Sequence, residues 1–105
     1  MKTLHISVVD KIATYLQRDG AIVCGNADYQ ILFAFDSEWE EYPERKARFI
    51  WNGERHDQVF TGNICHIPVI NDATEVIIGV FAGDLATTPT VIPCKKSIRC
   101  GALDD

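Results

Sequence analysis

Hydrophobic and polar residues alternate in short stretches along most of this chain. Between residues 3 and 9 the apolar positions are Leu4, Ile6 and Val8, and polar side chains stand between them. A period of two places the apolar side chains on one face of an extended strand, as expected where only that face is buried. The pattern therefore predicts a β-strand over residues 3–9.

Similar patterns predict strands in most of the remaining sequence. The segment 75–82 is the most apolar and is expected to be a central strand, in which Gly79 indicates a bulge or the close approach of another backbone. Pro68 limits the segment 64–69 to a sheet edge or a strand end. Further strands are predicted over 12–17, 21–24, 29–36, 45–52, 55–61, 90–94 and 96–100.

Two neighbouring strands carry more specific predictions. The segment 29–36 has apolar residues on both faces, so it is expected to be covered on both sides. In 45–52 the side chains of Ala47, Phe49 and Trp51 are expected to point inward. Asn52-Gly53 follows and is the strongest hairpin signal in the chain, because both residues tolerate the positive φ of a type I′ turn.

Only the segment 37–43 suggests a helical turn. Ser37 is expected to cap it, with Glu40 three residues later as in a capping box, and Pro43 ends it. No segment shows a helical period over ten or more residues. The predicted fold is therefore an all-β, antiparallel β-sandwich of about eight strands with at most one short helical turn. It forms one domain over residues 1–105, with 101–105 expected to be a frayed tail.

Composition narrows the classes of partner. Fifteen acidic and ten basic residues give a formal charge of −5, which argues against nucleic-acid binding because phosphate neutralisation needs a basic face. No apolar run approaches the roughly 18–20 residues of a membrane helix, and the start of the chain lacks the features of a signal peptide. We therefore expect a soluble protein made in the cytoplasm, with no membrane partner.

Four cysteines leave three possibilities. Cys24, Cys65, Cys94 and Cys100 form no CxxC pair, and His66 would lie on the opposite strand face from Cys65. Reduced, buried thiols are favoured, since a chain made in the cytoplasm is kept reduced. A disulfide framework and a metal site are the alternatives.

Motifs for catalysis are missing from the sequence. It contains no GxSxG, phosphate loop, HExxH or GxGxxG. The acidic stretch 36–44 is expected to be a solvated loop, and His5 and His56 are expected on outer faces. We therefore predict no enzyme activity, no catalytic or metal-binding residues and no cofactor.

Two groups of residues are candidates for binding a partner or ligand. Lys95, Lys96 and Arg99 form a basic stretch that could hold a small anion or an acidic partner, or could instead be a solvated edge that discourages aggregation. Trp39 and Tyr42 in the acidic stretch could contact a partner, but packing of the loop against the core is favoured.

Several stretches resemble a family of phage proteins. They are Phe33-Ala-Phe35-Asp-Ser-Glu-Trp39-Glu-Glu-Tyr42, Lys46-Ala-Arg-Phe49, Asn52-Gly53, Ile67-Pro68-Val69, Val80-Phe-Ala-Gly83-Asp-Leu and Ile92-Pro-Cys94-Lys-Lys. This pattern is similar to the N-terminal domain of baseplate upper proteins and related tail-fibre adaptors in phages of Gram-positive bacteria. The resemblance extends over about residues 1–100.

The resemblance implies a structural role. It suggests a β-sandwich without catalytic residues that docks to other phage tail proteins and self-associates in the virion tail, with the segment 96–100 as the expected contact strand. Because the sequence stops at Asp105 without a coiled coil, the chain could be an N-terminal domain or a stand-alone phage protein. The alternative function is an inhibitor of a host defence system that binds a host protein or sequesters a small phosphorylated signal.

Overall fold

Ten strands and two single turns of 3-10 helix make up the described part of the chain. The structure, a computed structural model, describes residues 1–98. The elements in chain order are β1 (Lys2–Val9), β2 (Ile12–Tyr15), η1 (Gln17–Asp19), β3 (Ile22–Val23), β4 (Tyr29–Phe35), η2 (Ser37–Trp39), β5 (Glu44–Trp51), β6 (Glu54–Thr61), β7 (Ile64–His66), β8 (Glu75–Ala82), β9 (Leu85–Ala86) and β10 (Thr90–Lys95).

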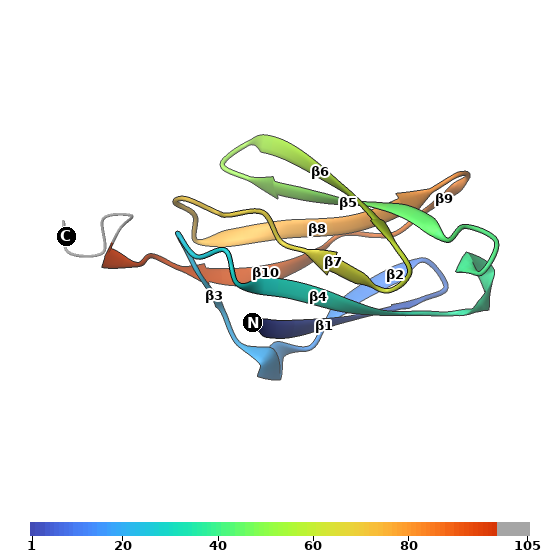
Figure 1. Cartoon of the computed structure of the whole chain (residues 1–105), viewed down its shortest axis with the longest axis horizontal. Helices are drawn as coiled ribbons and strands as arrows, with labels where there is room; N and C mark the ends of the chain where they lie inside the picture. The colour runs from blue at the N-terminus through green and yellow to red at the C-terminus, as the bar shows by residue number, and fades with distance from the viewer. Residues whose placement is uncertain (99–105) are drawn as a thin grey trace.

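Two sheets pack face to face, which confirms the predicted all-β sandwich (Figure 1). The smaller sheet has the strand order β2-β1-β4-β7, and the larger has the order β3-β10-β8-β5-β6, with β9 paired to β8. Most pairs are antiparallel, but β1 pairs with β4 and β3 with β10 in parallel. The expectation of a purely antiparallel sandwich is therefore wrong for these two pairs, because alternation reports which face is buried but not strand direction.

The inward faces of both sheets supply the core. Alternation in β1 buries Leu4, Ile6 and Val8, as predicted. Strand β8 lies between β10 and β5, which confirms its predicted central place. The inward side chains of β5 and β8 are fully or almost fully buried: Ala47, Phe49, Trp51, Val76, Ile78, Val80 and Ala82.

Three predicted strands differ from the structure. Strand β4 is covered on one face only, since Leu32 is 37% exposed and Ala34 is also exposed. The predicted strand 12–17 stops at Tyr15, and η1 follows it. The chain leaves the sheet after Lys95, so residues 96–98 form no strand, and 99–100 lie outside the described residues.

The structure confirms the predicted Asn52-Gly53 turn, adds a second hairpin turn, and changes the predicted cap of the helical turn. Asn52 and Gly53 have φ values of 53° and 76° and form the expected two-residue hairpin turn. Asp10 and Lys11 form a similar turn between β1 and β2 that was not predicted, because lysine stands where a strong turn signal has glycine. The helical turn η2 exists, but Ser37 does not cap it: Asp36 holds the N-cap position and makes no side-chain capping bond.

Two threonines join the sheets along one side. The hydroxyl of Thr88 accepts a hydrogen bond from Ala13 N at 3.2 Å, and that of Thr90 accepts one from Tyr15 N at 3.1 Å. We call this pair of bonds the threonine seam. The register of β10 on β8 differs by one residue from that of β9, so the extra residue lies in the segment 87–89 that passes Gly79 and not in β8 itself.

Candidate functional site

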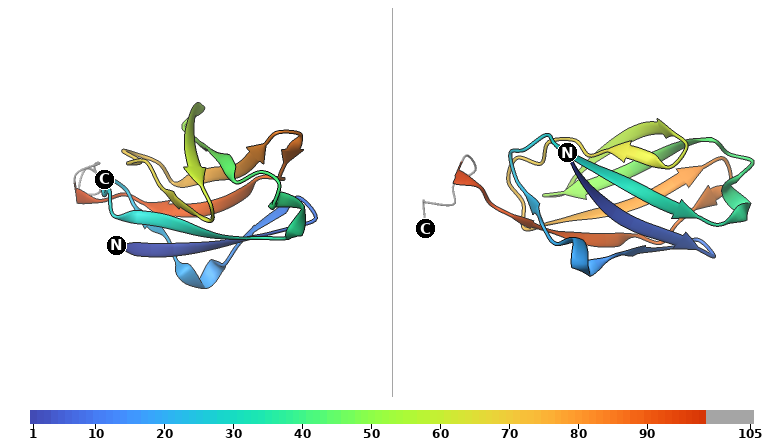
Figure 2. Two further views of the ribbon diagram at one scale, coloured as in Figure 1. Left: turned by 45° about the vertical axis from the view of Figure 1, so that its right-hand side comes forward. Right: turned by 60° about the horizontal axis from the view of Figure 1, so that its bottom comes forward.

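The predicted binding residues do not form one site. Trp39 lies in η2 at one end of the long axis of the molecule, and Lys95 ends β10 near the other end (Figures 1 and 2). Arg99 lies outside the described residues. The two groups of candidates must therefore be judged separately.

Trp39 packs in the core, as the favoured interpretation predicts. Its side chain is 0% exposed, and its ring centroid lies 5.0 Å from that of Phe35. Tyr42 is half-buried and lies against Gly83 in the turn after β8, where a Cβ atom would overlap its ring. The two aromatic residues thus attach the acidic stretch to the sandwich.

A buried arginine that sequence reasoning missed stands beside these aromatics. Arg45 is 6% exposed, and its guanidinium lies 4.3 Å from the centroid of the Phe35 ring. It donates to the carbonyl oxygens of Trp39 at 2.7 Å and Gly62 at 2.6 Å. Burial lowers the pKa of Arg45. Arg45 therefore ties η2 to the turn between β6 and β7, which is a structural role.

The acidic stretch is only partly a solvated loop. A carboxylate oxygen of Asp36 accepts a hydrogen bond from Asp10 N at 2.9 Å, and Glu38 forms an ion pair with Lys11 at 3.0 Å. These contacts hold the β1–β2 turn. Glu40, Glu41 and Glu44 remain exposed and are the carboxylates that a cationic partner could reach.

The basic residues near the end of β10 do not assemble an anion site within residues 1–98. Lys96 pairs with the carboxylate of Asp72 at 3.4 Å. Lys95 is exposed, and its backbone carbonyl accepts a hydrogen bond from Cys24 N. Strand β10 ends at Lys95, so Lys95 and Lys96 do not continue into a further strand within the described part of the chain.

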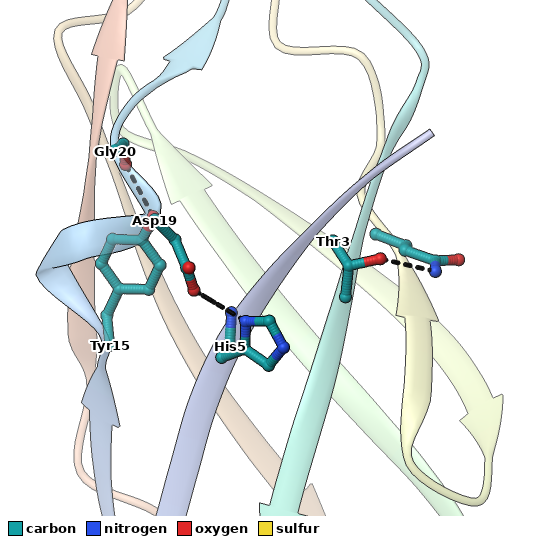
Figure 3. A network of polar contacts seen from close by, with 6 residues as sticks. Thr3, His5, Tyr15, Asp19 and Gly20 are labelled. Carbon is teal, nitrogen blue, oxygen red and sulfur yellow. Dashed lines mark hydrogen bonds and ion pairs between the residues drawn. The ribbon is translucent and has the colours of Figure 1, made fainter.

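His5 has a structural partner on the outer face of the smaller sheet (Figure 3). The Asp19 carboxylate accepts a hydrogen bond from His5 N at 2.8 Å and contacts His5 Nδ1 at 2.9 Å. The contact with the His5 side chain, and to a smaller extent the bond from His5 N, holds the pKa of Asp19 below its ordinary value of 3.8. The carboxylate thereby caps a backbone N–H of β1 at the point where β2 leaves the sheet.

The thiols and histidines among residues 1–98 do not form a recognisable reactive-thiol or metal-binding site. Cys24, Cys65 and Cys94 are buried and form no disulfide, and Cys100 lies outside the described residues. Burial raises the pKa of Cys65 and Cys94 to about 12, so both thiols stay protonated near neutral pH. Residues 1–98 contain no cluster of three or more His, Cys, Asp or Glu side chains that could hold a metal ion.

A groove of about 380 Å³ lies on the outer face of the larger sheet. Gly79 lines it between Ile77 and Phe81, and a Cβ atom at this position would lie 3.4 Å from the Thr87 hydroxyl oxygen. The Arg48 guanidinium lies 4.8 Å from the Phe81 ring centroid and forms two hydrogen bonds to the Asp57 carboxylate, at 2.9 and 3.1 Å. Most of the remaining lining is apolar: Ile50, Leu85, Ala86 and Pro89. The groove can accept an apolar group of moderate size.

The other candidate surface is the outer edge of the larger sheet. Strand β6 ends the strand order and, among residues 1–98, pairs only with β5, along all eight of its residues. The β5–β6 hairpin stands at the rim of the molecule, away from β1 and β2, in both Figure 1 and the left view of Figure 2. An unpaired edge offers a row of backbone donors and acceptors to another strand.

Sequence patterns did little to predict either the groove or the edge of β6. The segment 55–61 was predicted as a strand, but its place at the edge depends on pairing between residues far apart in the chain. Gly79 was the one signal for the groove.

No helix among residues 1–98 is long and apolar enough to cross a membrane. No family model, curated protein or solved structure matches the chain.

Proposed function

We propose that this chain is a structural module that docks to other proteins and self-associates, in the manner of the phage tail modules that its sequence resembles. The module carries out no reaction and acts through its surfaces in the virion tail. The observation that carries this proposal is the open edge of β6, an eight-residue strand paired on one side only. Edge pairing is a common route by which β domains bind other chains.

The groove on the outer face supports the same proposal. It lies on β5 and β8 of the sheet that β6 borders. Arg48 in its lining bonds to Asp57 on β6, so the groove and the edge share one face of the molecule. A partner strand on β6 would stand close to this apolar surface.

Sedimentation velocity on the purified chain tests the proposal over about a hundredfold range of concentration, because association follows mass action. We expect the weight-average sedimentation coefficient to rise with concentration. A chain that stays monomeric throughout contradicts self-association.

A thermal-shift screen of nucleotides on the same samples tests the alternative. If the chain sequesters a small phosphorylated signal, one nucleotide should raise its Tm through binding to the folded state. We expect no such rise, since Lys96 is already paired with Asp72. A large nucleotide-specific rise on a monomeric chain would replace the structural proposal with the inhibitor.

A further inference from the structure

Backbone groups of four residues in β6 face away from the sheet. Trp51 and Glu54 flank the two-residue turn and pair with one another, so their backbone groups bond across the hairpin. Hydrogen-bonded pairs then recur at every second residue, and the bond from Gly62 N to the Pro43 carbonyl at 3.0 Å continues this series. The residues between these pairs direct their N–H and C=O groups outward: Arg55, Asp57, Val59 and Thr61.

This edge has only part of the usual protection against pairing. Natural edge strands are commonly short, bulged, charged, or interrupted by proline. Strand β6 has eight residues, contains no proline or lysine, and keeps an unbroken register on β5; its charged side chains, Glu54, Arg55 and Asp57, lie in the half next to the turn. The other strands that end a sheet are shorter: β3 has two residues, β7 has three, and β2 is bonded through the threonine seam.

We propose that the occupant of this edge is β6 of a second copy of the chain, paired antiparallel about a two-fold axis at Gln58. This inference rests on the proposed self-association and names the surface that performs it. The dimer joins the larger sheets of both copies into one continuous sheet. Contacts about a two-fold axis are isologous, so each half of β6 must complement the other half.

The sequence of β6 favours this register over those centred at Asp57 or His56. With the axis at Gln58, Arg55 faces Thr61 and Asp57 faces Val59, so all four outward-facing residues are used and no like charges face one another. An axis at Asp57 would place two carboxylates directly opposite. An axis at His56 would place Val59 opposite Gly53 in the turn and Thr61 beyond the end of the partner strand.

The side chains near the axis are compatible with a second strand. Gln58 is exposed, and its amide can both donate to and accept from the same amide of the partner. Val59 is 52% exposed and would lie diagonally across the axis from Val59 of the partner subunit, which is an apolar neighbour. Asp57 is already neutralised by its two bonds to Arg48, which lowers the cost of bringing two β6 strands together.

A single shared strand pair buries little surface, so the dimer should be weak and dependent on concentration. The first test therefore removes one backbone donor from the edge. Val59→Pro deletes an outward N–H and no bond to β5, which is the position where an edge strand accepts proline. The matched control is Val59→Thr, which keeps both the N–H and the branched side chain.

We expect the dimer of Val59→Pro to be at least about tenfold weaker in sedimentation velocity, with the Val59→Thr dimer near that of the unchanged chain. If Val59→Pro associates as strongly as the unchanged chain, the edge is not the contact. The proposed function would then still stand, with self-association through another surface. If the unchanged chain does not associate, both proposals fail.

Cross-linking tests the register without relying on proline. In a Cys100→Ser background, Gln58→Cys places the introduced thiols opposite one another at the axis, and mild oxidation by oxidised glutathione should join the two copies through a disulfide. Arg55→Cys is the control, because its thiol faces Thr61 of the partner. Fast dimer formation by Gln58→Cys alone supports the proposal. Equal rates for both variants, or none for Gln58→Cys, would overturn it.

Discussion

Trp39 links the acidic stretch to the core, and its surroundings show how. The indole packs on Phe35, and Arg45 donates to the Trp39 backbone carbonyl. The indole Nε1 has no hydrogen-bond partner among residues 1–98. Trp39 therefore stabilises the fold through its apolar surface rather than through its polar atom.

Substitution of this residue separates packing from partner contact. We expect Trp39→Ala to lower the free energy of unfolding by about 3–5 kcal/mol, because it leaves a large cavity between the sheets. Trp39→Phe should cost much less, since it keeps an aromatic ring and loses no hydrogen bond. Urea denaturation followed by tryptophan fluorescence of Trp51 and by circular dichroism measures both. A negligible loss in Trp39→Ala would contradict the packing role.

At the level of secondary-structure elements, the threonine seam connects β2 to the larger sheet. Strand β2 has only four residues and one strand partner, β1. Its outward N–H groups at Ala13 and Tyr15 would need water if the hydroxyls of Thr88 and Thr90 were absent. A third bond, from Thr88 N to the Lys11 carbonyl at 2.8 Å, extends the contact to the β1–β2 turn.

Removal of one hydroxyl should weaken this contact measurably. Thr90→Val keeps the branched shape and strand propensity but leaves Tyr15 N without its acceptor, so we expect a loss of about 1–3 kcal/mol in chemical denaturation. Thr14→Val on β2 is the control. Thr14 is exposed and its side chain makes no hydrogen bond within the described chain, so its replacement should change stability little. Equal effects of the two variants would show that the seam contributes nothing.

Sequence predictions that rest on local signals were accurate, whereas features that depend on contacts between distant residues were missed. Alternation in β1 and β8 and the Asn52-Gly53 turn are local signals, and the structure confirms them. The exposed face of β4 was missed because apolar residues such as Leu32 do not reveal that no layer covers them. Arg45, the threonine seam and the edge position of β6 depend on residues brought together only by folding.

At the level of the whole molecule, the buried thiols report on the integrity of the sandwich. Cys24 follows β3, Cys65 lies in β7 and Cys94 lies in β10, so the three sample both sheets. The thiol of Cys65 is held protonated by burial, and that of Cys94 by burial and then by its neighbour Cys24. Only the thiolate reacts rapidly with disulfide reagents.

Thiol titration therefore measures global unfolding. In a Cys100→Ser background at pH 8, we expect the native chain to react very slowly and the denatured chain to expose three thiols. Colorimetric titration without reductant makes the comparison. Fewer than three thiols after denaturation, with recovery after reduction, would reveal a disulfide; rapid reaction of the native chain would contradict the buried placement.

The parallel pairing of β3 with β10 has a consequence for biosynthesis. Ile22 aligns with Cys94, and the threonine seam joins residues that are 75 positions apart in the chain. During translation β3 leaves the ribosome long before its strand partner β10 is made. Closing such long loops is entropically costly and slows folding. Strand β3 must therefore wait without its strand partner, and β2 must wait for the threonine seam, so the synthesis of residues 88–95 completes both contacts.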